Sequence, residues 1–318
     1  MRYFVTGGAG FIGSNYVEHL FQSVEGVTGV TIYDKFTYAA NPKNYQQFIH
    51  DPRLSIVKGD VCDIKLLEST MANHDFVVHF AAESHVDRSI EDASAFVQTN
   101  VLGTLNVLES SRKVGVKTVI HVSTDEVYGS LSDGSADENF PLKPNSPYAA
   151  SKAASDLLAR SYFETHGVDV RTTRCCNNYG KYQYPEKVIP VFINKLMSGE
   201  KLPIYGDGKN VREWIHVSDH VRGIQSILEK GTPGEIYNIG TGSHLSNNDL
   251  GMNIANAMGF GPEMTSFVKD RKGHDFRYSV NSSKLKALGF EAKVNLRDGL
   301  LGTIDWYRTY PDWWSTAP

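Results

Sequence analysis

The sequence predicts an α/β protein built on a doubly wound parallel sheet, with a smaller carboxyl-terminal lobe interleaved with that sheet. Short apolar runs alternate with helical patterns through the first half of the chain, which is the order of βαβ units. The strand-like runs are apolar throughout, as in strands that are buried on both faces. The regular alternation stops after residues 170–175, where a stretch rich in Asn, Tyr, Pro and Gly begins.

Length and composition exclude several classes of protein. The 318 residues suit one large or two medium domains, and 41% hydrophobic with 21% charged residues is ordinary for a globular chain. A net charge of -4 gives no support for a nucleic-acid partner. The chain has no long apolar run and no signal peptide, and its three cysteines have no zinc-like spacing. We therefore expect a cytoplasmic protein without a membrane, nucleic-acid or metal partner.

The first element in the chain is a strand at residues 3–6, followed at once by Gly7, Gly10 and Gly13 and then by a helical pattern. The first glycine permits a tight turn, the second lets backbone amides approach a pyrophosphate, and the third lets helix and strand pack closely. The amino end of the helix then faces the phosphates. The motif predicts a dinucleotide site of the Rossmann type. A structural glycine turn is the alternative, but it does not require this strand and helix context.

The second expected strand, residues 30–34, ends at Asp34, about 20 residues beyond the glycine loop. A carboxylate there accepts hydrogen bonds from a ribose hydroxyl and repels a 2′-phosphate, so the pattern favours NAD over NADP. A capping or solvated aspartate is the alternative, and the neighbouring Lys35 can weaken the discrimination.

Two further strands are expected before the catalytic region. Residues 54–61 form a strand in which Asp60 either contacts the adenine edge or caps the helix that follows. The strand at residues 76–82 ends in Ala81 and Ala82, whose small side chains let a cofactor pass close. A helical pattern then covers residues 93–114.

The residues best suited to acid and base catalysis follow the apolar strand at residues 118–122. Asp125 and Glu126 come at its carboxyl end, where ligands bind in open α/β sheets. Tyr148 and Lys152 are four apart and share one helical face. An ammonium beside a phenol lowers the phenol's pKa and makes it a usable base near neutral pH. Taken from the residues alone, a solvated strand end explains the two carboxylates equally well.

These residues carry a family resemblance. Gly7 to Gly13 with the Tyr148-xxx-Lys152 pair resembles the extended short-chain dehydrogenase/reductase superfamily of nucleotide-sugar enzymes. Within it the chain is similar to the dTDP-glucose 4,6-dehydratase family. The similarity runs from residue 4 to the tail, and the Thr124-Asp125-Glu126 triplet separates this family from epimerases and decarboxylases. Further matching runs are Ala81 to Ser89, Cys176-Asn177-Asn178-Tyr179-Gly180, Pro185-Glu186-Lys187, Asp270-Arg271 and Gly273-His274-Asp275.

The resemblance implies an NAD-dependent lyase whose reaction is redox-neutral. Tyr148 takes the C4 hydroxyl proton while hydride passes from C4 to NAD, and Thr124 hydrogen-bonds to the C4 oxygen. Glu126 removes the C5 proton, and protonated Asp125 donates to the departing C6 hydroxyl. Hydride then returns to C6, so NAD need not leave. Two adjacent carboxyls of unequal pKa can supply the acid and the base.

The resemblance also implies the residues that bind each ligand, with Lys152 completing the catalytic set of Thr124, Asp125, Glu126 and Tyr148. The expected NAD contacts are Gly7, Gly10, Phe11, Ile12, Gly13, Asp34, Lys35, Thr37, Asp60, Val61, Ala81, Ala82, Thr99, Tyr148, Lys152 and Asn178. The expected dTDP-glucose contacts are Ser84, His85, Thr124, Asn177, Glu186, Lys187, Arg212, Asn247, Arg271 and His274. Guanidinium groups pair well with a diphosphate, although a surface ion pair is the ordinary role of an arginine.

Organisation and assembly are expected as follows. Residues 1–176 form the NAD-binding domain, to which about 212–240 return, and 177–318 form mainly the substrate-binding lobe. Helices at 93–114 and 148–165 pair two copies as a homodimer. Ala40, Lys181 and Lys272 depart from the family pattern, and both lysines are expected to flank the substrate pocket.

Two alternatives to the dehydratase remain at this stage. One is a UDP-sugar 4-epimerase or decarboxylase of the same superfamily, and the other is a non-catalytic NAD-binding sensor. The sequence leaves open the choice between dTDP and UDP. It also leaves open whether the product serves a cell-wall polymer or a glycosylated natural product.

Overall fold

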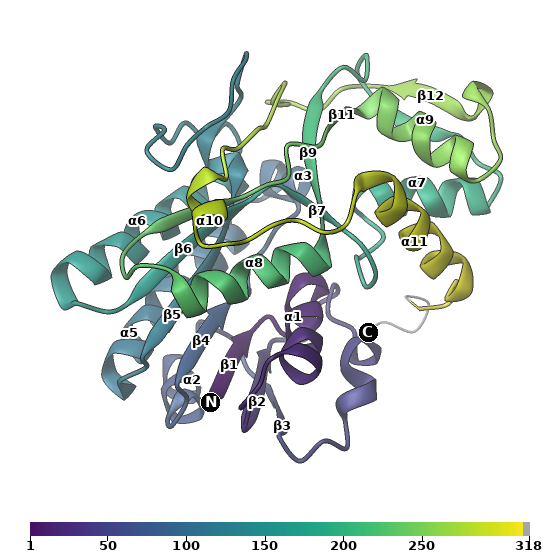
Figure 1. Ribbon diagram of the computed structural model, residues 1–318. Helices are drawn as coiled ribbons and strands as arrows, with labels where there is room; N and C mark the ends of the chain where they lie inside the picture. Colours follow the sequence, from purple (N-terminus) through teal and green to yellow (C-terminus); the bar gives the residue numbers. More distant parts are fainter. Residues whose placement is uncertain (314–318) are drawn as a thin grey trace.

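The computed structural model describes residues 1–313 and has a parallel seven-stranded sheet at its centre (Figure 1). Its strand order is β10-β6-β5-β4-β1-β2-β3. These strands are β1 (Arg2–Thr6), β2 (Gly29–Asp34), β3 (Leu54–Lys58), β4 (Phe76–His79), β5 (Thr118–Thr124), β6 (Val170–Cys175) and β10 (Ile236–Ile239). The doubly wound parallel sheet predicted from the sequence is confirmed.

The strand order reverses between β1 and β4. From β1 the chain proceeds outward to β2 and β3, and then returns to build β4, β5 and β6 on the other side. In open α/β sheets ligands bind outside the carboxyl ends of the strands at such a reversal. The glycine loop after β1 and the alanines after β4 therefore lie on the two sides of this crevice.

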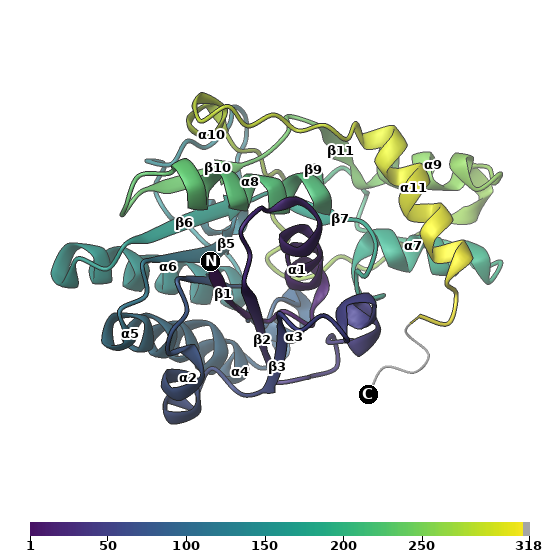
Figure 2. The same ribbon diagram turned by 60° about the horizontal axis from the view of Figure 1, so that its bottom comes forward.

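Helices cover both faces of the sheet, and Figure 2 separates the two layers. α1 and α8 pack together on one face, while α2, α5 and α6 cover the other. The helices of this domain are α1 (Phe11–Ser23), η1 (Pro42–Phe48), α2 (Ile64–Met71), α3 (Val86–Glu91), α4 (Ser94–Phe96), η2 (Val97–Gly103), α5 (Thr104–Val114), η3 (Asp125–Tyr128), α6 (Pro147–His166) and α8 (Val217–Lys230).

The helix expected over residues 93–114 is interrupted by the π-helical segment η2. A π-helical turn holds an extra residue compared with an α-helical turn, and such turns are frequent at functional sites. In this chain the π-helical turn contains Asn100. The Asn100 side chain donates to Ser151 Oγ at 2.8 Å and to the Glu83 carbonyl at 3.0 Å, and it accepts from the Glu83 amide at 2.9 Å. The irregular turn therefore joins the loop after β4 to the helix that carries Tyr148.

The smaller lobe has its own core around Phe192, Trp214 and Ile254. Two small sheets, ordered β11-β9-β7 and β12-β8, underlie it. Its elements are β7 (Asn177–Tyr179), α7 (Val188–Met197), β8 (Leu202–Tyr205), β9 (Val211–His216), β11 (His244–Ser246), α9 (Asn247–Ala257), η4 (Pro262–Met264), β12 (Thr265–Val268) and α11 (Leu296–Thr309). The short helix α10 (Ser283–Ala287) packs instead on β10 of the main sheet, and its Leu285 belongs to the core there. Strand β10 pairs with β6 in the main sheet. The domain division at residue 176, with the return of about 212–240, stays a prediction.

Several local expectations are corrected. The third strand stops at Lys58, before Asp60, because the chain turns there and Tyr33 Oη donates to the Asp60 carbonyl. The helix after it is capped by Asp63, not by Asp60. Helix α8 is capped by His216, whose ring accepts from the Ser218 amide.

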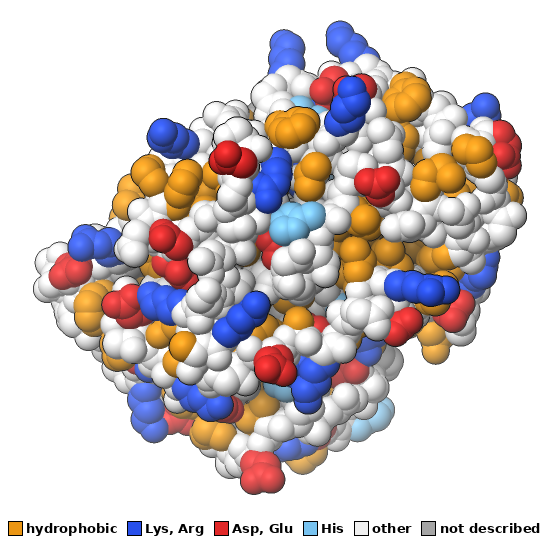
Figure 3. All heavy atoms as spheres, turned by 45° about the horizontal axis from the view of Figure 1, so that its top comes forward, with side chains coloured by type: hydrophobic (Ala, Val, Ile, Leu, Met, Phe, Trp, Pro, Cys, Tyr) orange, Lys and Arg blue, Asp and Glu red, His pale blue; other side chains and the backbone are white. Residues whose placement is uncertain are grey.

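Surface charges are mixed rather than segregated. Basic and acidic side chains are interspersed over the face shown in Figure 3. Within residues 1–313, no helix combines the length and the hydropathy that crossing a bilayer requires.

Candidate active site

A cavity of about 340 Å³ opens along the carboxyl ends of β1, β2, β4, β5 and β6. Every residue expected to contact NAD lines it, and so do the five residues of the expected catalytic set. Residues as far apart in the sequence as Gly7 and Asn178 therefore meet where the parallel strands end. The NAD residues are Gly7, Gly10, Phe11, Ile12, Gly13, Asp34, Lys35, Thr37, Asp60, Val61, Ala81, Ala82, Thr99, Tyr148, Lys152 and Asn178.

The first and last glycines of the loop have no room for a Cβ atom. Gly7 has φ +68°, and a Cβ there would lie 2.7 Å from the amide nitrogen of Ala81. A Cβ on Gly13 would lie 2.2 Å from the Gly7 carbonyl oxygen. The first turn of α1 has no side-chain cap, so its amides and the helix dipole face the cavity. This cradle fits the pyrophosphate of NAD.

The adenosine end holds a fixed carboxylate. Asp34 is buried, and its two oxygens accept from the amides of Ala9 at 3.0 Å and Phe36 at 2.8 Å. Each oxygen keeps a lone pair for a ribose hydroxyl. Lys35 Nζ pairs with Asp60 at 2.7 Å instead of with Asp34, so the lysine does not neutralise the carboxylate that is expected to reject a 2′-phosphate. The set fits NAD. When bound, NAD would supply a hydride acceptor and donor beside Tyr148.

The catalytic end begins where β5 enters the short helix η3. Thr124 caps η3 by accepting from the Glu126 amide at 3.2 Å, and its hydroxyl donates to Asp125 Oδ1 at 3.2 Å. The buried Asp125 Oδ2 has no hydrogen-bond partner within residues 1–313. A buried carboxyl oxygen without a partner strongly favours the protonated, neutral acid.

The two carboxyls differ in their electrostatic surroundings. Burial raises the pKa of Asp125 well above its ordinary value, and the Glu126 charge raises it further. Burial also raises the pKa of Glu126, but three cations nearby oppose that rise, namely Arg271, Arg212 and Lys187. Asp125 is therefore the group that keeps a proton near neutral pH, while Glu126 is the better base.

Tyr148 and Lys152 are both carried by α6, four residues apart. The expectation that Lys152 lowers the pKa of Tyr148 is wrong for the protein without ligands, because that pKa is raised. Burial raises the pKa of Tyr148, the Glu126 charge raises it further, and a hydrogen bond with Thr124 lowers it only in part. Lys152 Nζ donates to the Val122 carbonyl at 2.7 Å. Burial lowers the pKa of Lys152 to about 8. The ammonium is thus bound by the strand, and the largest causes of the raised phenol pKa are burial and the Glu126 charge.

The expected substrate residues divide into two groups. Ser84, Thr124, Asn177, Glu186 and Lys187 line the cavity, and Lys187 Nζ donates to the Ser84 carbonyl at 2.7 Å. Glu186 pairs with Arg88 at 3.3 Å and accepts from Tyr38 Oη at 3.2 Å. The residues outside the cavity lining are His85, Arg212, Asn247, Arg271 and His274.

Two of the residues outside the lining, Arg212 and Arg271, still influence the charge of Glu126 in the site. Arg271 and Arg212 are near enough to lower the pKa of Glu126. The Arg212 guanidinium stacks 4.3 Å from the Tyr278 ring centroid and donates to the Asp275 carbonyl at 2.9 Å. His274 pairs with Asp270 at 2.6 Å, Asn247 begins α9 and His85 caps α3. Lys181 is not part of the cavity lining, and it pairs with Glu18 on α1 at 2.6 Å.

Sequence reasoning missed several residues of the cavity wall. Cys175 is the last residue of β6 and Ser123 the last but one of β5, so their position at the carboxyl ends of expected strands could have indicated both. His220 lies on α8, and its Nδ1 contacts Asn178 Oδ1 at 2.8 Å. No motif singles out His220, because it enters the site from a helix that follows the smaller lobe's first elements.

Comparisons with known proteins agree with this geometry. The family described as GDP-mannose 4,6 dehydratase matches residues 4–302. A dTDP-glucose 4,6-dehydratase of Streptomyces griseus is 52% identical, with 98% of this chain and 95% of that protein covered.

Solved structures are similar over their whole length. The dTDP-glucose 4,6-dehydratase DesIV of Streptomyces venezuelae, solved with NAD and dTDP bound, has a TM-score of 0.98 and 51% identity, and all of both chains is covered. A UDP-glucose 4-epimerase of Thermotoga maritima has a TM-score of 0.90 at 30% identity, covering 98% of this chain and 100% of that one. A cofactor cradle, an acid pair and a phenol at one sheet edge, together with a match over residues 4–302, show that this chain belongs to the GDP-mannose 4,6 dehydratase family.

Proposed function

We propose that the chain is an NAD-dependent dTDP-glucose 4,6-dehydratase, a lyase that forms dTDP-4-keto-6-deoxyglucose. The observation that carries this proposal is the acid pair Asp125 and Glu126, of unequal pKa, beside Tyr148 in the cavity that fits NAD. An oxidation at C4 alone needs only Tyr148 and Lys152. An elimination of water needs a second acid and a second base, and this cavity has both.

Tyr148 is the residue that exchanges a proton with the C4 hydroxyl. It lies beside Thr124, whose hydroxyl is placed to hydrogen-bond to the C4 oxygen. The raised pKa of Tyr148 makes the phenol a strong proton acceptor once it is ionised. Lys152 lies one helical turn from Tyr148 on α6, where its Nζ donates to the Val122 carbonyl.

Glu126 and Asp125 divide the elimination between them. Glu126 is the better base because three cations stabilise its carboxylate. Asp125 keeps its proton because it is buried next to Glu126, and it donates that proton to the departing C6 hydroxyl. Lys187 lines the cavity, and Arg271 and Arg212 lie close enough to act on Glu126, so these three cations provide positive charge that suits the diphosphate of a sugar nucleotide.

The test of the proposed function is incubation of the purified protein with dTDP-glucose, without added NAD, followed by mass spectrometry. We expect the loss of one water from the sugar nucleotide. Product of unchanged mass would instead indicate a 4-epimerase, and loss of CO₂ from a UDP-sugar acid would indicate a decarboxylase. No turnover of dTDP-, UDP- or GDP-sugars, even with NAD added, would favour a binding protein and contradict the roles of Asp125 and Glu126.

A homodimer is proposed from exposed apolar side chains on two adjacent helices. Val97 and Leu102 on η2 are 54% and 46% exposed, and Leu157 on α6 is 60% exposed. η2 packs against α6, so these exposed side chains belong to two neighbouring helices. An apolar face of this kind is typical of a contact between subunits. The cytoplasmic location expected from the sequence stays a prediction.

The homodimer predicts a clear result for one substitution. Wild-type protein is expected to scatter light with twice the chain mass, and Leu157→Glu is expected to be monomeric because a charge cannot be buried unpaired in an apolar interface. Leu301→Glu on α11, where Leu301 is 39% exposed, is the matched control and should stay dimeric. A monomeric wild-type mass at micromolar concentration would contradict the proposal.

A further inference from the structure

The end of the described chain returns from the smaller lobe to the cofactor domain. α11 ends at Thr309, and residues 310–313, here called the C-terminal strap, run from it to η1. Figures 1 and 2 both show α11 and η1 on the same side of the molecule. Trp313 makes the contact: its carbonyl accepts from Asn41 Nδ2 at 2.9 Å, and its indole Nε1 donates to Asn44 Oδ1 at 2.9 Å.

Asn44 connects this contact to the glycine loop. Its side chain is buried, with Oδ1 bound to Trp313 and Nδ2 donating to the Ala9 carbonyl at 3.1 Å. The Asn41 amide donates to the same carbonyl at 3.1 Å. The Ala9 amide donates to Asp34 at 3.0 Å. A continuous series of hydrogen bonds therefore runs from the strap through Asn44 to both the phosphate cradle and the ribose carboxylate.

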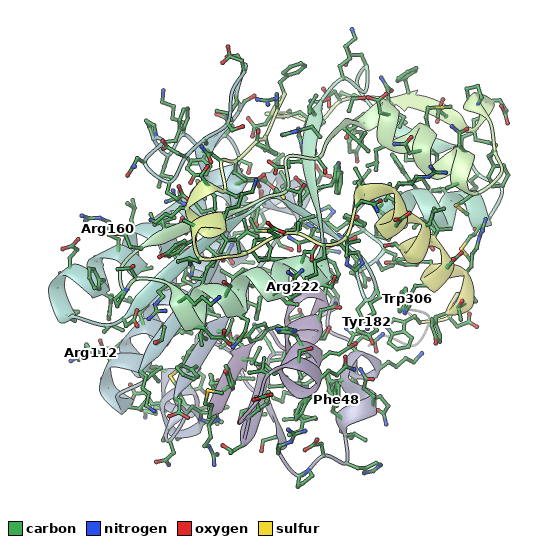
Figure 4. All side chains as sticks on the ribbon, in the orientation of Figure 1. Phe48, Arg112, Arg160, Tyr182, Arg222 and Trp306 are labelled. Atoms are coloured by element: carbon green, nitrogen blue, oxygen red, sulfur yellow. The ribbon has the colours of Figure 1, made fainter. Side chains whose placement is uncertain are left out.

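A second contact holds the strap from the opposite side. The Tyr182 ring stacks on Trp313, with centroids 5.3 Å apart and planes 19° apart. Tyr182 adopts φ +72°, a left-handed conformation that is costly for an aromatic residue. Its neighbour Lys181 pairs with Glu18 on α1, the helix that the glycine loop opens. In Figure 4 Tyr182 and Trp306 lie beside each other, above the η1 segment that carries Phe48.

We propose that Trp313 is a positioning residue that retains NAD by locking Asn44, and through it the glycine loop. This rests on the proposed function, because a redox-neutral dehydration needs the same cofactor to remain bound from the first hydride transfer to the last. Trp313 lies outside the cavity lining and touches neither the expected nicotinamide end nor the acid pair. Its contribution is therefore to cofactor binding, not to the chemical steps.

The test compares Trp313→Phe with the wild type. Phenylalanine keeps a ring against Tyr182 but has no N–H to donate to Asn44. Bound NAD is chased with isotopically labelled NAD, and its release is followed by mass spectrometry. Loss of one buried hydrogen bond of about 1.4 kcal/mol corresponds to release about tenfold faster. With saturating NAD, kcat for dTDP-glucose is expected to be unchanged, so that only the apparent KM for NAD rises.

Trp306→Phe is the matched control. Trp306 packs on Trp313 and Tyr182 in the same aromatic cluster, with ring centroids 5.3 and 5.5 Å away, and its side chain makes no hydrogen bond to η1 within residues 1–313. It is expected to release NAD at the wild-type rate. Wild-type release from Trp313→Phe, equal acceleration in both variants, or a fall in kcat at saturating NAD would each overturn the proposal. The chase needs no turnover, so it decides this inference even if dTDP-glucose is not the substrate.

Discussion

Glu126→Gln is expected to reduce dehydration of dTDP-glucose by about 10²- to 10⁴-fold, which is the usual contribution of a general base. Glutamine has nearly the same shape but cannot accept the C5 proton. Oxidation at C4 does not require Glu126, so that step should still proceed. The reaction would then stop with the cofactor reduced, which absorbance at 340 nm measures directly. Mass spectrometry should find no loss of water on the wild-type time scale.

Asp125→Asn distinguishes the two carboxyls. It removes the proton donor to the C6 hydroxyl and keeps the C5 base, so exchange of the C5 hydrogen with D₂O should continue while water loss falls. Glu126→Gln should abolish that exchange. If Glu126→Gln exchanged C5 hydrogen at the wild-type rate, the assignment of base and acid would have to be reversed.

Tyr148→Phe is expected to have the second large effect, again about 10²- to 10⁴-fold in rate, because it removes the only group proposed to take the C4 proton. Tyr148→Phe should block the first step, oxidation at C4, whereas Glu126→Gln should block the later removal of the C5 proton. Here no reduced cofactor should accumulate, because the first step itself fails. A single-turnover experiment at 340 nm separates the two variants.

The absence of reduced cofactor can be attributed to the missing proton acceptor only if the Tyr148→Phe variant still binds NAD. Its ring stays buried beside Phe96, 6.3 Å between centroids, so the fold should be retained. NAD content after purification is the control measurement. Accumulation of reduced cofactor in Tyr148→Phe would show that another group takes the C4 proton, and the role of Tyr148 would be withdrawn.

The central sheet could be predicted because strands buried on both faces are apolar runs and the glycine loop fixes where the first one ends. The cavity followed from one rule, that ligands bind at the carboxyl ends of parallel strands. Gly7, Asp34, Asp125 and Tyr148 therefore converge in the structure from four separate segments.

Other features depend on contacts between segments that are distant in sequence, and no local pattern contains them. The π turn at Asn100 exists because its side chain bridges to Ser151 and Glu83. The pKa of Tyr148 depends on burial and on Glu126, whereas the sequence shows only that Lys152 lies one helical turn away. His220 enters the cavity from α8, after the chain has already built part of the smaller lobe.

The pairing of β10 with β6 bears on how the molecule unfolds. Ile236–Ile239 covers the outer edge of β6, although residues of the smaller lobe lie between them in the chain. If a protease cut the chain near residue 176 and the two fragments separated, β6 would be left as an open edge and α1 would lose its contact with α8. An exposed edge of a buried parallel strand invites pairing with other chains. We therefore expect the two halves to unfold together as one unit.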